Sequence, residues 1–574
     1  MGVNETTPML KQEYGTAMAE PVNERDNQNG GHSGGTASNA NRDHDGDRIG
    51  LRRKSSYLTR SDSRLHTHGS FLEDARHFRE GTVPHSVTMA LVIGIVCGVA
   101  AWAYYAILEY ALAFIWHKLP KMIIIGKWPE WAYVLWIPIV GLTSAIFVGL
   151  SVIMLGEPGD LPYTVKAVHD HGYMEIDHAL PMVAASQFSL IGGGSLGPEA
   201  PLVAVCACLG GFISRKGFRM KRRNIVRKHT LMGMAGALAA FFGCALGGSL
   251  FALEINSRLG VEYFEHAMEA ILCGTVTLTV FRALAGLPIG PIWQITVDKI
   301  PSAEPLEVIY GAAIGLIGAF VAYLFATMHW RVMDGFNYFG LMPNDRAIYR
   351  ALVGAVVIVG IGMAIPQTMF WGEVEFQTLS TLSPASTLPH IWPTSGLFGF
   401  EMNSGLTSLL TGVAKLVAIS FTVSGGYRGG YIFPFFATGA CLGRAIWFVF
   451  PYMPVQITIL CVASGLNVAI TRTGLATPLI LCALAGEQEA LAPVLAASLA
   501  SLMATAYMPF IKSQVARSDV EGSLFFYHDE PHWYEDDEGD LIDGDIVAND
   551  LVIDEGNEEE SSEASGEENG NLVV

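Results

Sequence analysis

The chain has 574 residues, of which 51% are hydrophobic and only 16% are charged. This composition excludes an ordinary soluble globular protein, and the formal net charge of -19 argues against a nucleic-acid-binding protein. The charge imbalance is local, because residues 529–574 contain 18 acidic residues and no Lys or Arg. We therefore expect an all-α polytopic membrane protein with a nearly neutral body and an acidic tail.

The N-terminal residues 1–83 are rich in Asn, Gly, Ser, Arg and Asp and have almost no aliphatic runs. Such a stretch cannot bury enough apolar area to offset the entropy lost on ordering. It also lacks the apolar core of a signal peptide. The sequence therefore predicts a disordered N-terminal tail.

Apolar segments follow one another from residue 84 to residue 513, and several are long enough to cross a hydrocarbon core of roughly 30 Å. Residues 88–116 and 132–155 are clear examples of such long segments, whereas other segments are shorter or are cut by Gly and Pro, as in residues 231–255 and 478–508. Backbone groups freed by such breaks must be hidden in protein or face a watery cavity. We expect a transmembrane domain in which half-spanning helices meet at a buried site.

One basic loop indicates the orientation in the membrane. Residues 214–229 contain eight Lys or Arg between two apolar segments, and such short basic loops stay on the cytoplasmic side. Both tails are expected to be cytoplasmic as well. No address signal distinguishes the plasma membrane from an organellar membrane.

Three stretches share a pattern in which glycines are followed by a proline at an expected helix start. Glycine lets the backbone approach a ligand closely, and proline is tolerated at the first helical position because its N–H group would be unpaired there. Helix N-termini also carry a partial positive charge, so three of them together would bind an anion at the middle of the membrane. A single glycine-rich stretch would instead indicate close helix packing. The stretches are GEPGDLPYTVKAV from Gly156, GGGSLGPEAPLV from Gly192 and GGYRGGYIFPFF from Gly425.

Glu199 is an ionisable residue inside the second of these stretches. In a soluble protein it would be a helix N-cap, whereas within a membrane an ionisable side chain is a functional candidate. Its charge has the same sign as the expected substrate. The carboxylate can therefore compete for the anion site when it is ionised and leave it when it is protonated, which would make Glu199 a gate.

In this order, the three stretches resemble the signature motifs of the CLC family of chloride channels and chloride/proton exchangers. The family's G-S-G-I-P, G-R-E-G-P and G-x-F-x-P motifs correspond to residues 158–162, 197–201 and 430–434. The resemblance implies an inverted repeat of tilted and half-spanning helices over residues 84–513, and a homodimer with one pore per subunit. It also implies chloride as the permeant ion, with no enzyme activity, cofactor or metal. The acidic remainder, residues 514–574, is too short and too charged for the CBS domains of some relatives.

The resemblance also implies roles for individual residues. Glu199 resembles the gating glutamate, and the backbone amides of Ile432 and Phe433 resemble those that hold the central anion. The full set of implied anion-binding positions comprises Gly159, Asp160, Gly197, Glu199, Tyr431, Ile432 and Phe433.

Departures from the motifs are informative. Gly159 replaces the family's central serine, so a hydroxyl donor to the anion is lost and selectivity between chloride and nitrate is open. By ungapped alignment the family's central tyrosine falls at Gln488, so no tyrosine is assigned to the pore.

The inner glutamate of the exchangers falls at Ile255, and an aliphatic side chain cannot relay protons. The adjacent Glu254 is expected to be a helix-end carboxylate near the cytoplasm, paired with Arg258, and a proton relay is the alternative role.

The sequence thus predicts a voltage-gated chloride channel, with a chloride/proton antiporter or a pore for another anion such as nitrate as alternatives. A membrane hydrolase is a remote alternative. Residues 193–197, GGSLG, fit the spacing G-x-S-x-G, but Ser195 has no histidine partner in its segment. The histidine-rich stretch HDHGYMEIDH from His169 lacks the i, i+4 spacing of a helical metal site. We expect that stretch to be a solvated loop or a pH-sensing surface.

Overall fold

The computed structural model describes residues 82–156, 158–159, 161–256, 263–296, 300, 303–508 and 510. Within these residues every regular element is helical, and an isolated antiparallel bridge joins Gly197 to Gly430. This confirms the predicted all-α fold class. The predicted tails lie outside the described residues, apart from Thr82 and Val83.

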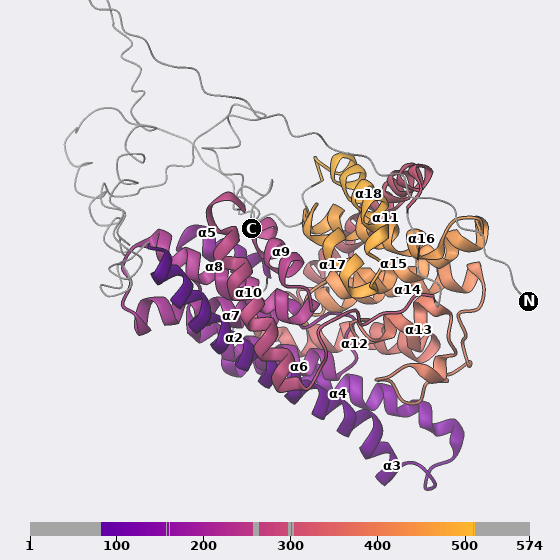
Figure 1. Cartoon of the computed structure of the whole chain (residues 1–574). Coiled ribbons are helices and arrows are strands. Elements are labelled where there is room, and N and C mark those ends of the chain that lie inside the picture. The colour runs from indigo at the N-terminus through magenta and orange to yellow at the C-terminus, as the bar shows by residue number, and fades with distance from the viewer. Residues whose placement is uncertain are drawn as a thin grey trace, which may run out of the picture. The chain divides into compact units, whose positions relative to one another are not determined.

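The first group of helices begins with the long α2 and is drawn in indigo to magenta in Figure 1. It comprises α2 (Val83–Leu112), α3 (Leu119–Ile123), α4 (Trp136–Leu155), α5 (Leu161–Asp170), α6 (Ala179–Ile191), α7 (Glu199–Phe212), α8 (Arg223–Phe242), α9 (Ala245–Asn256) and α10 (Tyr263–Ala285).

The second group begins with another long helix and follows in chain order. It comprises α11 (Pro305–Tyr338), α12 (Ala347–Ala364), α13 (Glu375–Thr381), α14 (Gly405–Ser424), α15 (Ile432–Val449), α16 (Val455–Thr471), α17 (Ala476–Ala485) and α18 (Leu491–Ala504).

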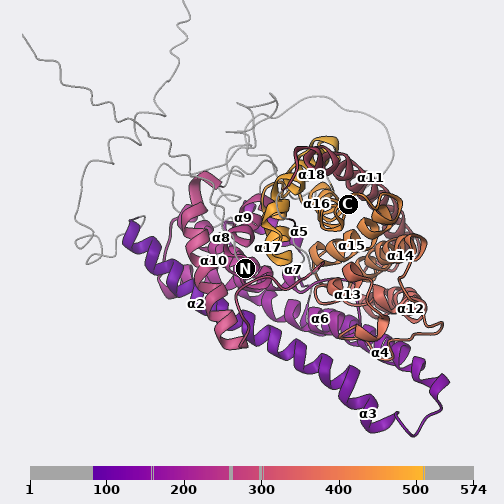
Figure 2. The same cartoon turned by 45° about the vertical axis from the view of Figure 1, so that its right-hand side comes forward.

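The two groups lie side by side, as Figures 1 and 2 both show. Within the first group, α10 packs on α2 and α8, and α7 packs on α8; within the second, α11 packs on α16 and α18, and α15 packs on α14 and α16. The groups meet where α4 contacts α12 and where α9 contacts α17. The helices α7 and α15 both begin inside the protein, since Glu199 and Ile432 are buried, so their N-termini are shielded from lipid.

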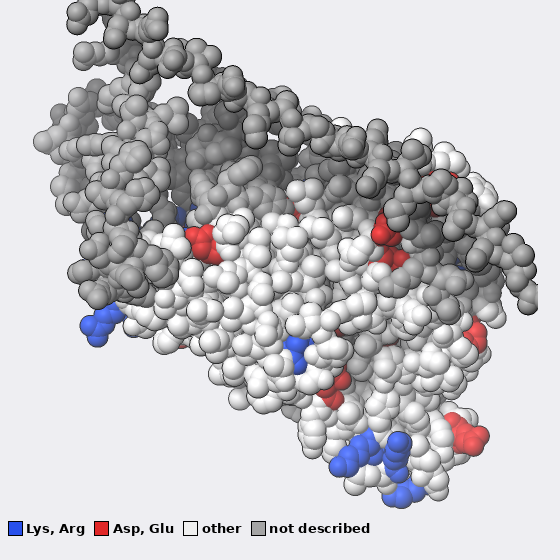
Figure 3. Space-filling view, viewed as in Figure 1, with Lys and Arg blue, Asp and Glu red and all other residues white. Residues whose placement is uncertain are grey.

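The surface of the helical body is apolar. Eight described helices are long and apolar enough to cross a membrane, and large side chains such as Ile309 and Phe320 on α11 are more than half exposed. Figure 3 shows one face on which charged side chains are sparse across the middle and Lys and Arg gather at one tip. Such an exterior suits lipid, because apolar surface on this scale would not remain exposed to water.

Glycines let three helices of the second group approach closely. A Cβ on Gly315 of α11 would lie 2.2 Å from the carbonyl oxygen of Ala497, and one on Gly465 of α16 would lie 2.6 Å from the carbonyl oxygen of Gly315. Small residues at such interfaces permit the van der Waals contact that holds helices together in lipid. By contrast, nothing lies within 4 Å of the Cβ position of Gly335, which is also on α11.

This contrast gives a matched pair of substitutions on one helix. Gly315→Ala should destabilise the protein by roughly 1–3 kcal/mol, because the added methyl must push α18 away. Gly335→Ala should leave stability unchanged or slightly higher, since alanine has the greater helix propensity. Thermal unfolding of the two purified variants in detergent measures the difference, and equal melting temperatures would contradict this account of the packing.

Candidate functional site

Two glycine-containing segments that are far apart in sequence pair at the centre of the protein. The N–H group of Gly197 donates to the carbonyl of Gly430 at 2.8 Å, and the N–H group of Gly430 donates to the carbonyl of Gly197 at 2.7 Å. This short antiparallel pairing satisfies polar backbone groups that lipid could not hydrate. It also sets the starts of α7 and α15 beside one another.

Both helices begin directly after this pairing. Pro198 is the N-cap of α7, and Tyr431 is the N-cap of α15. Neither residue offers a side-chain cap to the first N–H groups. Because the first amides of a helix have no intrahelical acceptor, those of α15 are available to a ligand.

The carboxylate of Glu199 reaches from the start of α7 to the start of α15. Its Oε1 accepts hydrogen bonds from the backbone N–H groups of Ile432 at 2.8 Å and Phe433 at 3.4 Å. The side chain is only 1% exposed, and within the described part of the chain Oε2 has no hydrogen-bond partner. The Glu199 carboxylate thus binds both amides through Oε1, while Oε2 makes no hydrogen bond to the described residues.

Glycine is required around this carboxylate for steric reasons. A Cβ on Gly430 would lie 2.5 Å from both Cγ and Cδ of Glu199, and one on Gly197 would lie 1.8 Å from its Oε2. The two glycines therefore form a cradle the size of a carboxylate. Asn467 of α16 supports it from behind by donating to the carbonyl of Ile432 at 3.2 Å.

The structure brings Gly197, Glu199, Ile432 and Phe433 together, as the motifs predict. The ring of Tyr431 instead packs against Phe435 and Phe510, so this residue contributes only backbone to the start of α15. Asp160 lies outside the described residues. That these groups bind the transported anion stays a prediction.

Gly159 lies against Tyr163 and Met174. A Cβ there would come within 2.5 Å of the Tyr163 ring and 2.8 Å of the Met174 methyl. The space that a serine side chain would need is therefore filled by these two residues. Tyr163 is held in turn by its hydroxyl, which lies 3.0 Å from Nε2 of His178.

The exchanger position is aliphatic and buried, because Ile255 is 1% exposed on α9. The neighbouring Glu254 caps α17, with its two oxygens accepting the N–H groups of Leu475 at 3.0 Å and Ala476 at 2.9 Å. Glu254 therefore lies at a helix end, as predicted, but the helix whose N-terminus it caps is α17 and not its own helix, α9. The proposed partner Arg258 lies outside the described residues.

Gln488, where the central tyrosine would fall, is exposed at the start of a 3-10 turn, Gln488–Ala490. Two other tyrosines are buried near the glycine segments. Tyr104 of α2 lies 3.0 Å from the Ser186 hydroxyl, and the Tyr427 ring lies 3.3 Å from the Cβ position of Gly194. Among the described residues no hydrogen bond joins either hydroxyl to the Glu199 carboxylate, but Tyr104 interacts electrostatically with it.

The expectation that HDHGYMEIDH is a solvated loop is wrong for its first residue and for Met174, both of which are buried. His169 is only 3% exposed, and its Nε2 hydrogen-bonds the carbonyl of Asn256 at the end of α9. Asp170 and His171 are exposed, as expected. The helix α5 runs through His169, so its amphipathic turn buries this side chain while the next two residues face outwards.

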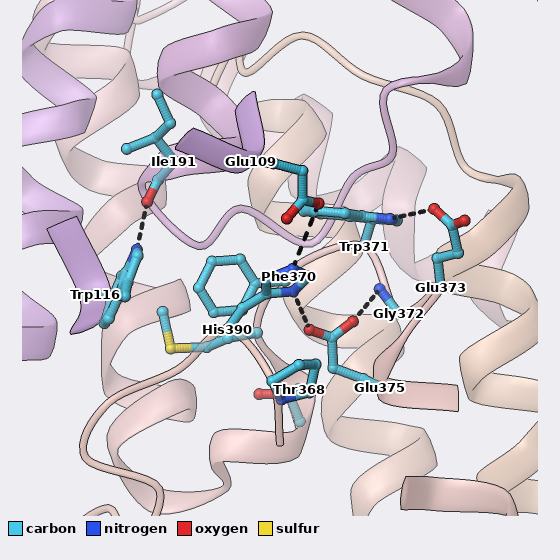
Figure 4. Close-up of polar contacts among 12 residues, drawn as sticks. Glu109, Trp116, Ile191, Thr368, Phe370, Trp371, Gly372, Glu373, Glu375 and His390 are labelled. Atoms are coloured by element: carbon cyan, nitrogen blue, oxygen red, sulfur yellow. Dashed lines mark hydrogen bonds and ion pairs between the residues drawn. The ribbon is translucent and has the colours of Figure 1, made fainter. Parts of the chain in front are cut away.

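Sequence reasoning missed a second polar cluster in which Lys415, Glu375 and His390 are buried together. One signal was available for it, since Lys415 is the only charged residue in the apolar segment 405–424. Its partners Glu375 and His390 come from the linker between α12 and α14. No short sequence motif predicts contacts between residues so far apart in the chain. Figure 4 shows Glu375 and His390 directed towards one another.

Comparison with known proteins gives a family match. Residues 156–506, more than half of the chain, match the family described as voltage gated chloride channel. The protein named "Putative ion-transport protein YfeO" from Salmonella paratyphi A is 26% identical over 403 residues, covering 67% of this chain and 86% of that protein. The protein of that name from Escherichia coli O139:H28 is 25% identical over 398 residues, covering 67% and 84%.

Solved structures share the fold. A slow cyanobacterial Cl-/H+ antiporter superposes with a TM-score of 0.61 at 15% identity, covering 75% of this chain and 97% of that one. A CLC-type fluoride/proton antiporter superposes with a TM-score of 0.59 at 18% identity, covering 78% and 99%. At these identities the likeness shows the fold alone.

The cradle makes a structural prediction. Gly430→Ala should leave the protein folded but expel the Glu199 carboxylate from the Ile432 and Phe433 amides, because the flexible side chain can move and the backbone cannot. Gly360→Ala is the control, since nothing lies within 4 Å of its Cβ position. A high-resolution structure of the Gly430 variant that retains the 2.8 Å contact between Glu199 and Ile432 would refute this steric argument.

Proposed function

The chain belongs to the voltage gated chloride channel family, and on this basis we propose that it conducts a small monovalent anion through a pore gated by Glu199. One observation carries the proposal: the Glu199 carboxylate lies on the first amides of α15, where an anion would compete with it. The protein is a membrane transport protein and not an enzyme. Chloride is the proposed permeant ion.

The amides of Ile432 and Phe433 favour an anion over a cation for electrostatic reasons. They are the unpaired donors at a helix N-terminus, and burial strengthens their attraction for negative charge. A dehydrated halide can accept from both amides, as Oε1 of Glu199 does. When Glu199 is protonated its attraction for these amides weakens, so acidification should favour the open state.

Passive conduction is proposed over proton exchange. Ile255 cannot carry a proton, and both oxygens of Glu254 already cap α17. Two of the solved neighbours are proton-coupled antiporters, so chloride/proton exchange is the alternative within the family. Nitrate is the alternative permeant ion, because Tyr163 and Met174 fill the place of the family's serine side chain and the serine hydrogen bond to chloride is lost.

The proposed assembly is a homodimer with one pore per subunit, with both tails cytoplasmic. It would lie in the plasma membrane or in an organellar membrane. The hydrolase alternative is not supported. Ser195 lies in the glycine segment, where its N–H group donates to the Thr422 hydroxyl. The family to which the chain belongs consists of transport proteins.

The deciding measurement is the reversal potential of the purified protein in liposomes under a chloride gradient and then under an added pH gradient. A channel gives a potential set by chloride alone, whereas an exchanger gives one that shifts with pH. We expect no pH shift. A reversal potential that moves with the proton gradient would establish exchange and overturn the conduction proposal.

The gate assignment has its own test. Glu199→Gln should raise the resting chloride flux and abolish its dependence on pH and voltage, because the neutral amide no longer competes as an anion. Glu130→Gln, at an exposed carboxylate on a connecting turn, is the control and should behave as wild type. A Glu199→Gln variant that kept normal gating would remove Glu199 from this role.

A further inference from the structure

The segment 368–373, between α12 and α13, touches both halves of the anion site. The N–H group of Phe370 donates to the carbonyl of Gly193 at 3.2 Å, in the glycine stretch that leads to α7. On the other side, a Cβ on Gly372 would lie 2.5 Å from the Ala437 Cβ and 3.5 Å from the Phe433 carbonyl oxygen, both on α15. The segment is therefore wedged between the two polypeptide stretches that form the cradle.

A second contact connects this segment to Phe433. The indole N–H of Trp293 donates to the carbonyl of Glu373 at 2.7 Å, and the Trp293 ring meets the Phe433 ring edge-on at 6.2 Å between centroids. Trp293 also stacks on Phe376 of α13 at 3.8 Å. Any shift of the segment would thus be transmitted to the residue whose amide faces Glu199.

A buried lysine holds the segment from α14. Lys415 is 1% exposed, and its ammonium donates to the carbonyls of Thr368 at 2.9 Å, Met369 at 3.3 Å and Phe370 at 2.6 Å. Three consecutive carbonyls that converge on one cation cannot adjust independently. The charge-assisted bonds therefore fix the backbone conformation at this point.

A buried carboxylate and imidazole hold the other end, as Figure 4 shows. Oε2 of Glu375 accepts the N–H group of Gly372 at 3.1 Å, and Oε1 accepts Nδ1 of His390 at 2.6 Å. On its other side, Nε2 of His390 lies 3.9 Å from the partly exposed Glu109 of α2. These four residues form an alternating chain of charges, Lys415, Glu375, His390 and Glu109.

The central pair stays charged near neutral pH. Burial alone would lower the pKa of His390, but the charges of Glu375 and Glu109 and its hydrogen bonds to them raise it to about 10. Burial would likewise raise the pKa of Glu375, yet the nearby His390 and Lys415 hold it below its usual value. Glu375 and His390 therefore form a fixed ion pair that does not respond to small pH changes near neutrality.

We propose that Lys415, Glu375 and His390 are positioning residues of the anion site, which hold segment 368–373 so that the amides of Ile432 and Phe433 keep the spacing that a single dehydrated anion requires. This proposal rests on the proposed anion conduction. It assigns selectivity among anions to a charged cluster that contacts no anion.

Glu375→Gln tests the proposal, because it leaves Lys415 and His390 as buried cations without the carboxylate between them. The nitrate-to-chloride permeability ratio of the reconstituted variant should change by about threefold or more. Glu401→Gln is the matched control, since Glu401 also accepts one backbone N–H group, that of Ala385, but is exposed in the same linker. Adding Lys415→Gln to Glu375→Gln should move the ratio further from wild type, because the carbonyls of Thr368, Met369 and Phe370 then lose their ammonium donor.

The same measurement in the Glu199→Ala background separates the site from the gate. If the cluster positions the amides, Glu375→Gln changes the permeability ratio in the Glu199→Ala background as well. If Glu375→Gln has no effect on the ratio in that background, the cluster acts on the gate and the proposal is wrong. A folded Glu375→Gln variant with the wild-type ratio also overturns it. If that variant does not fold, His390→Gln carries the same test, because Glu375 then keeps Lys415 as its cation. Absence of anion flux from the wild type would instead contradict the proposed function.

The raised pKa of His390 adds a pH readout that a merely structural role would not give. Because its pKa is 6.5 unperturbed and about 10 here, the stabilising charge is complete below about 6.5 and is lost as pH rises through about 10. The difference between the permeability ratios of the wild type and of His390→Gln should therefore disappear above about pH 10. Parallel drift in both proteins would contradict the assignment.

Discussion

The organisation of this protein depends on a few backbone N–H groups that have no partner of their own at the start of α15. In a membrane interior such donors are too costly to leave empty, and here the Glu199 carboxylate fills them. The rest of the centre follows from that need. Gly197 and Gly430 must lack side chains to admit the carboxylate, their mutual pairing brings α7 to α15, and Asn467 fixes the turn that presents the amides.

Backbone groups also stabilise buried charges elsewhere in the protein. Lys415 binds three carbonyls, Glu254 binds two amides at the start of α17, and Glu375 binds the amide of Gly372. Each charge therefore fixes a turn at which a helix begins or a linker bends. Helix starts and bent linkers leave such backbone groups without partners, and the buried charges occupy them.

The sequence predicts the parts of this arrangement that rest on local chemistry. Glycine followed by proline marked the starts of α7 and α15, and an ionisable residue in an apolar stretch marked Glu199. The replacement of serine by Gly159 was visible too, but that Tyr163 and Met174 fill the vacated space depends on packing between α5 and the turn that follows it. The cluster of Lys415, Glu375, His390 and Glu109 was not predicted, because its members come from separate elements and no sequence period relates them. The burial of His169 was missed because a run of polar residues masked the helical turn that carries it.

The contrast between Glu199 and Glu254 bears on how a single acid side chain can act as a gate. Both are buried carboxylates next to helix N-termini, yet Glu254 commits both oxygens to amides of α17, whereas Glu199 uses one oxygen and leaves the other without a partner among the described residues. Releasing Glu254 would strip the cap from a helix. Releasing Glu199 frees amides that an arriving anion can occupy at once, so the exchange costs little net hydrogen bonding. A carboxylate can alternate with its substrate only where the two satisfy the same donors, and in this protein Glu199 meets that condition.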